Sequence, residues 1–224
     1  MVTNAGVLRD RVLWKMTDDD FDTVVDVHLR GTFTCARAAV LRMREQGDGG
    51  RVIVAGSPAG QRGNFGQTNY AAAKAGIVGM VRTWALELGR AGITANAVIP
   101  VAATAMTATL PYFAAAVEAE KKGEPMPAFF RHDLGFGTSD DVAGLISYLA
   151  SDAASDVTGQ ATEIGGARVQ MGPPPQPGAT AYREGGGWAA AGQAAGRPLR
   201  PNHGQSVGER FPPLPDEFQP PAQG

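Results

Sequence analysis

The sequence predicts an α/β fold in which helices cover a parallel sheet. From the start of the chain to about residue 166, short runs rich in β-branched residues alternate with longer segments of helical period. This alternation is typical of successive β-α units in a parallel sheet. The chain has 224 residues, of which 43% are hydrophobic, so it can form one domain with a sizeable core.

The first long helix is predicted over residues 17–45. Thr17 and Asp20 have the spacing of a capping box, with aspartate in place of glutamate. Behind them stand residues spaced for one helical face, namely Phe21, Val24, Val25, His28 and Leu29. The glycine-rich stretch that follows ends this helix. Residues 51–55 then predict a buried strand, which ends at Ser57.

A second long helix is predicted to begin between residues 67 and 70 and to end between residues 89 and 92. A strand over residues 93–100 follows it. Ser139 is the predicted N-cap of the next helix, because two aspartates occupy its first turn and favour the positive end of the helix dipole. A short strand over residues 161–164 is the last one expected.

The chain is expected to divide into a folded domain over residues 1–171 and a tail over residues 172–224. Prolines cluster at two places in the tail, with three consecutive glycines between the clusters. Such a segment cannot bury enough apolar surface to offset its ordering entropy, so we expect it to be mostly disordered. Its aromatic residues could still dock locally, and residues 212–215 could adopt polyproline II.

Composition argues against several classes of protein. The net charge is −2 without a dense stripe of lysine and arginine, so we expect neither nucleic acid nor a membrane surface as partner. The start lacks the features of a secretory signal, and no uncharged apolar run approaches the ~20 residues of a spanning helix. The chain has a single cysteine, Cys35, so it cannot form an intramolecular disulfide. We expect Cys35 to be a small residue of the core. A chain without disulfides favours a reducing, cytoplasmic location. We assign no metal site.

Tyr70 and Lys74 are the first pair that suggests chemistry. They stand four residues apart in a predicted helix, so their side chains project from one face. A free phenol has a pKa near ~10, and a neighbouring ammonium favours the phenolate, which brings the tyrosine closer to working pH. Such a pair also arises by chance on helix surfaces. Ser57 strengthens the case, because it ends a predicted strand at the sheet edge where ligands of parallel folds bind.

Ser57, Tyr70 and Lys74, in this order and spacing, resemble the catalytic residues of the short-chain dehydrogenase/reductase family. Further motifs of that family are matched by Asn4-Ala5-Gly6, Leu29-Arg30-Gly31-Thr32-Phe33, Pro100, Thr158-Gly159-Gln160 and Gly165-Gly166. The resemblance covers nearly everything from residue 4 to residue 166. It implies a Rossmann-like, doubly wound parallel sheet and an NAD(P)-dependent oxidoreductase.

The resemblance also implies a role for each matched residue. Tyr70 exchanges a proton with the substrate oxygen, Ser57 hydrogen-bonds that oxygen, and Lys74 holds the nicotinamide ribose. The cofactor, NAD or NADP with NAD slightly favoured, carries the hydride. Residues expected close to the cofactor are Asn4, Ala5, Gly6, Tyr70, Lys74, Pro100 and Thr104.

Two residues depart from the pattern of the family. His28 replaces an asparagine that anchors a water relaying protons to the lysine, and an imidazole can also relay protons. Simple packing is the alternative role for His28. Val101 replaces the glycine that commonly follows the matched proline.

The motifs around residues 27–31 and 63–70 resemble the (3R)-hydroxyacyl-CoA dehydrogenase domain of multifunctional β-oxidation enzymes and, in part, 3-oxoacyl carrier-protein reductases. A 3-hydroxyacyl or 3-oxoacyl thioester is therefore the leading substrate, and another ketone or secondary alcohol, such as a steroid, is next. Residues 108–131, where the family builds a substrate lid, contain Met126, Phe129 and Phe130. They could hold an acyl chain or simply pack among themselves.

The glycine-rich turn that holds the cofactor pyrophosphate in this family has no counterpart here. We therefore expect an N-terminally truncated domain that begins within the family's fourth strand and binds NAD(P) poorly as it stands. Either the enzyme has a glycine-rich turn encoded upstream, or the chain is a non-catalytic partner of a complete homologue. Members of this family commonly form dimers and tetramers, so we expect a homodimer or homotetramer. In the second case the chain would pair with the complete homologue through small residues of the second long helix, Ala72, Ala73, Ala75, Gly76 and Gly79.

Overall fold

A computed structural model describes residues 1–104, 107, 111–172 and 215–219. The chain forms two units, residues 1–172 and residues 173–224. The described part of the second unit contains one short 3-10 helix, η9 (Asp216–Phe218). The rest of the expected disordered tail, with most of the polyproline segment, lies outside the described residues, so these expectations stay predictions.

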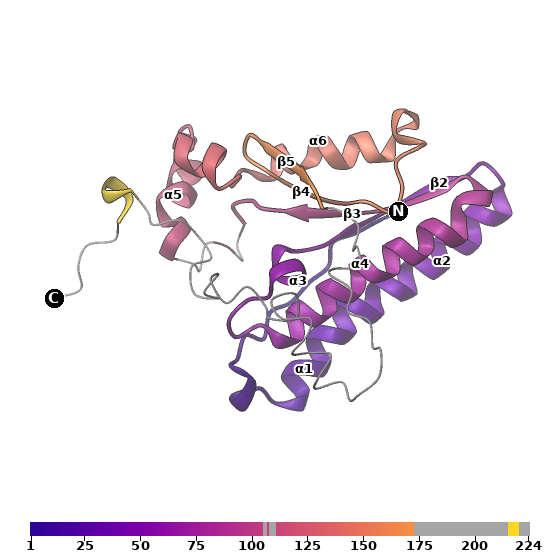
Figure 1. Ribbon diagram of the computed structural model, residues 1–224, viewed down its shortest axis with the longest axis horizontal. Coiled ribbons are helices and arrows are strands. Elements are labelled where there is room, and N and C mark those ends of the chain that lie inside the picture. Colours follow the sequence, from indigo (N-terminus) through magenta and orange to yellow (C-terminus); the bar gives the residue numbers. More distant parts are fainter. Residues whose placement is uncertain (105–106, 108–110, 173–214, 220–224) are drawn as a thin grey trace, which may run out of the picture. The chain divides into compact units, whose positions relative to one another are not determined.

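The first unit contains a five-stranded sheet whose strands lie in chain order (Figure 1). The strands are β1 (Val2–Thr3), β2 (Gly50–Ala55), β3 (Ile93–Pro100), β4 (Ala161–Gly165) and β5 (Arg168–Met171). Neighbours from β1 to β4 pair in parallel, with Thr3 beside Val54 and Ala55 beside Val98, and β5 pairs antiparallel with β4. The expected α/β class with a largely parallel sheet is confirmed.

The expectation that the sheet ends with residues 161–164 is wrong. A tight turn at Gly166, whose φ is +55°, leads back into β5 and forms a hairpin with β4. Val169 and Met171 of β5 are both 61% exposed. This strand has only four residues, so its alternation of polar and apolar residues is too short to identify a strand from the sequence.

The first predicted long helix forms, but in three consecutive segments. They are α1 (Asp18–Val25), the π-helical turn η2 (Asp26–Arg30) and α2 (Gly31–Gln46). The capping box is confirmed, because Thr17 Oγ1 accepts from the Asp20 backbone N–H at 3.1 Å and Asp20 Oδ2 accepts from the Thr17 N–H at 3.2 Å. Gly47, with φ of 80°, ends α2. The π turn contains His28 and is not visible in the hydrophobic pattern.

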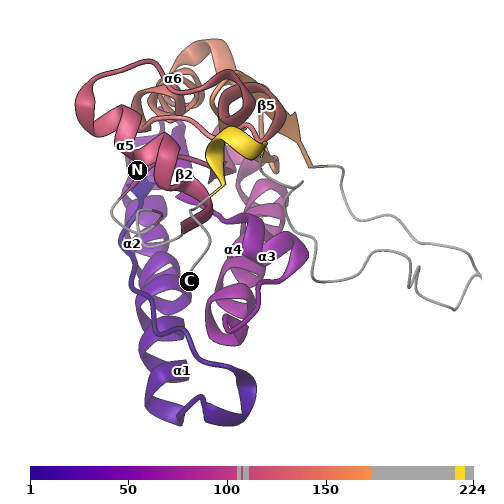
Figure 2. The same cartoon turned by 90° about the vertical axis from the view of Figure 1, so that its left-hand side faces the viewer.

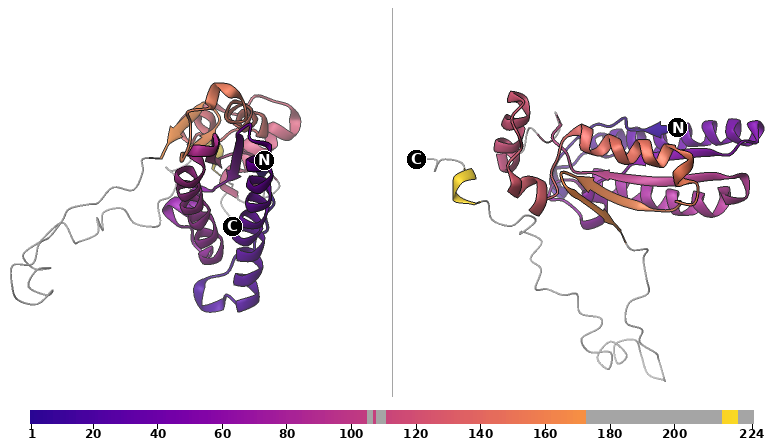
Figure 3. Two further views of the ribbon diagram at one scale, coloured as in Figure 1. Left: turned by 90° about the vertical axis from the view of Figure 1, so that its right-hand side faces the viewer. Right: turned by 90° about the horizontal axis from the view of Figure 1, so that it is seen from above.

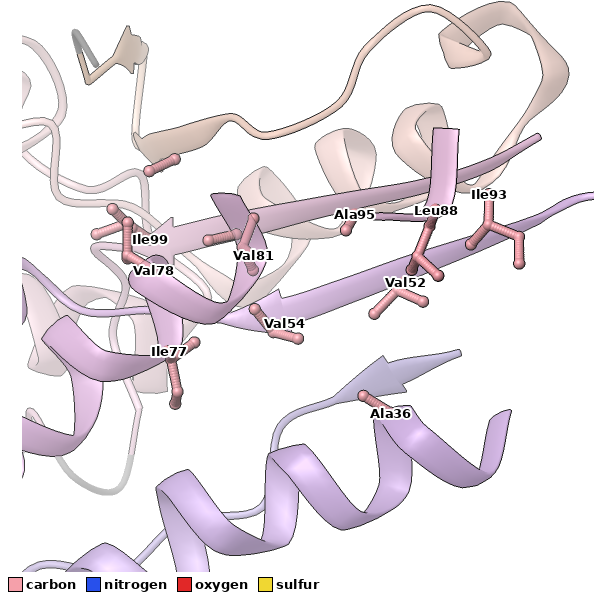
Figure 4. Packing of buried hydrophobic residues seen from close by; sticks show 12 residues of the cluster. Ala36, Val52, Val54, Ile77, Val78, Val81, Leu88, Ile93, Ala95 and Ile99 are labelled. Atoms are coloured by element: carbon pink, nitrogen blue, oxygen red, sulfur yellow. The ribbon is translucent and has the colours of Figure 1, made fainter. Parts of the chain in front are cut away.

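The larger core lies between the sheet and the two long helices, α2 and α4 (Thr68–Leu88) (Figures 1 and 4). Aliphatic side chains of α4 pack on those of β2 and β3, and Ala36 of α2 joins them; the α4 and strand residues include Val52, Val54, Ile77, Val78, Val81, Leu88, Ala95 and Ile99. The next residue back, Cys35, is exposed, so its expected place in the core is wrong.

Helix α6 (Ser139–Ala150) covers the opposite face of the sheet (Figures 1 and 2). Its Val142 and Leu149 pack with Ile53 of β2, Val98 of β3 and Ile164 of β4. Successive residues of a strand point to opposite faces, so β2 and β3 supply side chains to both cores. This explains why both strands are almost continuously apolar.

Thr138, and not Ser139, caps α6. Thr138 Oγ1 accepts from the Asp141 backbone N–H at 3.3 Å, and Asp141 Oδ2 accepts from the Thr138 N–H at 2.8 Å, which completes a capping box. The sequence offered two neighbouring hydroxyl residues, and only Thr138 stands three residues before a carboxylate whose side chain returns to it.

Thr138→Ala is expected to lower the free energy of unfolding by about 1 kcal/mol in urea titrations. Ser139→Ala, inside the helix, should change it by a few tenths at most.

The segment expected to form a substrate lid lies at the end of the sheet toward which the parallel strands point (Figure 3). Its described elements are η5 (Pro111–Phe113), α5 (Ala114–Lys122) and the π turn η6 (Phe129–Asp133). Phe113 stacks on Phe136 with centroids 4.2 Å apart, and Phe130 and Met126 are buried. Phe113 and Phe130 therefore pack with Phe136, a residue beyond the expected lid segment, while residues 108–110 lie outside the described residues and the lid role stays a prediction.

The other elements in the described part of the first unit are short. They are η1 (Leu13–Lys15), α3 (Pro58–Arg62), η3 (Gly89–Ala91) and η7 (Asp152–Ala154). Across the described part of the chain, no helix combines the length and apolar character needed to cross a bilayer.

Candidate active site

Three parallel strands bring their carboxyl ends to one edge of the sheet. Asn4 follows β1, Ser57 follows β2, and Pro100 ends β3. In parallel α/β sheets, ligands bind just beyond this edge. The topology therefore gathers segments that lie far apart in the chain.

Ser57 starts a short helix directly after β2. Its Oγ accepts from the Ala59 backbone N–H at 3.2 Å, which makes Ser57 the N-cap of α3. Pro58 at the first helical position supports this start, a signal present in the sequence. The helix therefore fixes the backbone of Ser57 at the sheet edge.

Gly60 lets α3 lie directly on α4. A Cβ atom at residue 60 would stand 2.7 Å from the backbone of Lys74 and of Ala75. No side chain fits at such a separation, so the absence of one permits the contact. The contact brings Ser57 beside the helix that carries Tyr70 and Lys74.

Tyr70 lies in the first turn of α4 and is buried. Burial raises the pKa of its phenol, a hydrogen bond with the Ser57 side chain opposes that shift, and the negative charge of Asp10 adds to it. The expected lowering of this pKa by Lys74 is wrong for the protein by itself. The lysine ammonium lies over the ring face, 5.6 Å from its centroid, and not beside the phenol oxygen.

Lys74 is buried, and its side chain makes one hydrogen bond within the described part of the chain. Its Nζ donates to the Ala55 carbonyl oxygen at 2.6 Å, one residue before the turn to Ser57. Burial lowers the pKa of Lys74 to about 8. An ammonium has three N–H donors, so two of them remain available to a ligand at the sheet edge.

His28 approaches Tyr70 from the π turn. The two rings meet edge to face with centroids 5.0 Å apart. His28 Nε2 lies 2.8 Å from the Val7 carbonyl oxygen and 3.1 Å from the Val7 backbone nitrogen, while its buried Nδ1 has no hydrogen-bond partner among the described residues. Burial lowers the pKa of His28, the Val7 backbone opposes this shift, and the charge of Lys74 adds to it. The imidazole is therefore neutral at pH 7.

Gly6 follows β1 at the carboxyl ends of the strands and packs closely against the ring of His28. A Cβ at residue 6 would lie 2.6 Å from His28 Cε1, so Gly6→Ala must displace the ring. We expect this variant to lose about 1–3 kcal/mol in urea unfolding, the usual effect of overpacking. Gly79→Ala is the control, because its added methyl meets nothing within 4 Å and sits inside α4, where alanine is favoured by about 1 kcal/mol. A stable Gly6→Ala protein would contradict the close packing.

The other predicted site residues are placed less centrally. Asn4 and Ala5 are exposed at the end of β1. Val101, after Pro100, uses its backbone N–H on the Ile164 carbonyl and its carbonyl on the Gly137 N–H. Thr104 bonds with Thr107, its N–H donating to Thr107 Oγ1 at 2.7 Å. No hydrogen bond joins Thr104 to the Ser57, Tyr70 and Lys74 cluster among the described residues.

Three contributors to the site were not predicted from the sequence. Gly60 and Asn69 shape α3 and the start of α4, and only Asn69 carried a signal, its place beside Tyr70 in the matched motif of residues 63–70. Glu163 of β4 is buried and pairs with Arg62 at 2.9 Å and with Arg168 at 3.1 Å. It ties the far end of α3 to the β4–β5 hairpin, a contact over about a hundred residues that no local pattern reveals.

A parallel sheet that carries a serine, a tyrosine and a lysine together at its carboxyl edge has the arrangement of a short-chain dehydrogenase/reductase. A family model described as enoyl-(acyl carrier protein) reductase matches residues 1–166. The chain belongs to the short-chain dehydrogenase/reductase family. Members of this family generally use NAD or NADP.

Individual relatives agree with this assignment. A 3-oxoacyl-acyl-carrier-protein reductase of Thermotoga maritima is 44% identical over 171 residues, which cover 75% of this chain and 65% of the relative. A (3R)-3-hydroxyacyl-CoA dehydrogenase of Rattus norvegicus is 39% identical over 168 residues, 74% of this chain and 61% of the relative. The chain thus spans less than two thirds of the length of these relatives.

A solved structure shares the fold. The crystal structure of a short chain dehydrogenase from Mycobacterium avium superimposes with a TM-score of 0.69 at 31% sequence identity. The match covers 96% of this chain and 64% of that chain. The resemblance in sequence and the resemblance in three dimensions therefore point to one family.

Proposed function

We propose that the protein is an NAD(P)-dependent oxidoreductase that interconverts a secondary alcohol and a ketone. The observation that carries this proposal is the meeting of Ser57, Tyr70 and Lys74 through α3 and α4. A hydroxyl, a phenol and an ammonium at one sheet edge can bind an oxygen, transfer its proton and hold a sugar hydroxyl.

The described residues fit the nicotinamide half of the cofactor. Lys74 has free N–H donors, and the exposed backbone of Asn4, Ala5 and Gly6 stands at the same edge. Pro100 ends the neighbouring strand, and Thr104 follows it. When bound, the nicotinamide supplies or accepts the hydride.

The proton chemistry belongs to Tyr70. In the reducing direction its phenol donates a proton to the substrate oxygen, while the Ser57 hydroxyl donates a hydrogen bond to that oxygen. In the oxidising direction the phenolate takes the alcohol proton. His28, neutral beside Tyr70 and Lys74, is the proposed proton relay in the position of the family's asparagine, because its Nδ1 makes no hydrogen bond among the described residues.

A 3-hydroxyacyl or 3-oxoacyl thioester is the proposed substrate. Relatives named for such substrates, in the acyl-carrier-protein and coenzyme A series, support this choice. We propose NAD as the first cofactor to test and a homodimer or homotetramer as the assembly. Of the small α4 residues proposed for packing, Ala72, Ala75 and Gly79 are exposed, whereas Ala73 is buried and Gly76 faces Leu29. The exposed thiol of Cys35 suits a reducing, cytoplasmic compartment.

Two measurements test the proposal. Nicotinamide mononucleotide contains only the half of the cofactor that this site fits, so saturation-transfer NMR should detect its binding to the chain. Lys74→Met should abolish that signal, whereas Lys122→Met, at an exposed lysine of α5, should retain it. Second, NAD- or NADP-linked oxidation of (3R)-3-hydroxyacyl-CoA, followed as reduced nicotinamide, should depend on Tyr70. Binding that is indifferent to Lys74, or turnover that survives loss of Tyr70, would refute the proposal.

A further inference from the structure

Asn69 directly precedes Tyr70 and is completely buried. Its Nδ2 donates to the Arg9 carbonyl at 3.0 Å and to the Asp20 carbonyl at 2.9 Å. Its Oδ1 accepts from the Tyr70 backbone N–H at 2.8 Å. One side chain thus joins three segments: the stretch after β1, the first turn of α1 and the first turn of α4.

The bond to the Tyr70 N–H substitutes for a missing cap. Gln67, the N-cap of α4, makes no side-chain capping bond. The first N–H groups of a helix have no partner within it, and Tyr70 supplies one of them. Without Asn69 Oδ1, this buried donor would stand unsatisfied at the residue whose side chain carries the phenol.

The two donor bonds fix where that turn lies. Arg9 belongs to a segment that runs alongside the approach to α4, because the Arg11 N–H donates to the Gly66 carbonyl at 2.8 Å. Gln67 Nε2 reinforces this contact by donating to Asp10 Oδ2 at 2.8 Å. Asp20 belongs to the helix that continues into the π turn and His28, whose ring rests against Tyr70. Asn69 therefore links the backbone of Tyr70 to the element that presses on its ring.

We propose that Asn69 is a positioning residue for Tyr70, and that its buried amide locks the first turn of α4 onto residues 9–20 so that the phenol stays beside Ser57. The role of Tyr70 rests on the function proposed above. The position of its ring does not, and it can be measured without turnover.

The test compares Asn69→Ala with Asn96→Ala. Asn96 is an equally buried amide in β3, whose Nδ2 donates to the Val157 carbonyl at 2.7 Å and whose Oδ1 accepts from the Gln160 N–H at 3.1 Å. It bridges backbone groups in the same way but lies away from Tyr70. Both variants should lose thermal stability, because each leaves buried backbone groups without partners.

The deciding signal is the ring of Tyr70 in protein carrying ¹³C-labelled tyrosine, assigned by its loss in Tyr70→Phe. In Asn69→Ala we expect the ring signal to shift toward that of free tyrosine and its titration midpoint to fall, because the loosened turn exposes the phenol. In Asn96→Ala both should stay unchanged. Where turnover is measurable, Asn69→Ala should lower kcat by on the order of 10–100-fold with little change in KM.

If Asn69→Ala does not fold, a milder variant can be measured in its place. Asn69→Ser keeps a hydroxyl beside the Tyr70 N–H and removes both bonds to Arg9 and Asp20, so its ring signal should shift partway. An unchanged Tyr70 signal in a folded Asn69 variant, or an equal shift in Asn96→Ala, would overturn the positioning role. A Tyr70→Phe protein that remains active would refute the proposed function and leave the Asn69 measurement valid.

Discussion

Tyr70→Phe is expected to lower turnover roughly 10²–10⁴-fold while the fold remains intact, because the substitution removes only the group that exchanges a proton with the substrate. The effect should appear in kcat for oxidation of a 3-hydroxyacyl thioester with NAD or NADP. Tyr148→Phe is the matched control. Tyr148 is an exposed phenol of α6, and its Oη makes only a long hydrogen bond of 3.4 Å to the Ala153 carbonyl. If Tyr70→Phe were as active as Tyr148→Phe, Tyr70 would not be the residue that exchanges a proton with the substrate.

The protonation state of Tyr70 should also make the rates of reduction and oxidation depend on pH. Burial holds the pKa of Tyr70 above its usual value, so the group is protonated at neutral pH. Reduction needs the phenol and should proceed well at pH 7, whereas oxidation needs the phenolate and should accelerate as the pH rises. Bound cofactor adds its own charge to the site, so the midpoint is to be measured in the complex.

Lys74→Met is expected to combine loss of function with a gain in stability. Removing a donor that holds ligand should lower turnover by about 10²–10³-fold. The protein should nevertheless unfold less readily at pH 7, because it no longer buries an ammonium. A pKa lowered from 10.5 to about 8 corresponds to about 3 kcal/mol, at roughly 1.4 kcal/mol for each pKa unit. Trade-offs of this kind are common at functional sites.

The sign of the pH dependence follows from the lowered pKa. Below pH 8 both the folded and the unfolded protein carry a protonated lysine, so the wild type bears the full destabilisation. Between pH 8 and 10.5 only the unfolded chain binds the proton, and wild-type stability rises with pH through this window. The stability advantage of Lys74→Met should therefore shrink to nothing above pH 10.5. Urea unfolding at pH 7, 9 and 10.5 measures it, and Lys122→Met should show no such trend.

The sequence predicted the sheet well where burial was two-sided. Strands β2 and β3 are apolar on both faces, and the long helices α2 and α4 end at glycines, so their bounds were readable. Strand β5 was missed because its four residues are too few for a polar–apolar alternation to stand out. The capping residue of α6 was misplaced by one position, because two hydroxyl residues are adjacent and side-chain geometry decides between them.

The candidate site was predictable as a set of residues and not as a set of interactions. The order and spacing of Ser57, Tyr70 and Lys74 identified the residues that the fold brings together. Their pKa values depend on burial and on where each side chain points, and the spacing of residues in the sequence encodes neither. For this reason the pKa of Tyr70 is raised and not lowered as expected. Contacts such as Glu163 with Arg62 join residues far apart in the chain and leave no local trace.

The contact at Gly60 has a mechanical consequence. Because α3 rests on the α4 backbone at the level of Lys74 with no side chain between them, a displacement of one helix is transmitted to the other. We therefore expect the hydroxyl at the head of α3 and the ammonium on α4 to move together as one unit. The missing side chain at Gly60 thus sets the distance between α3 and α4, and with it the separation of Ser57 and Lys74.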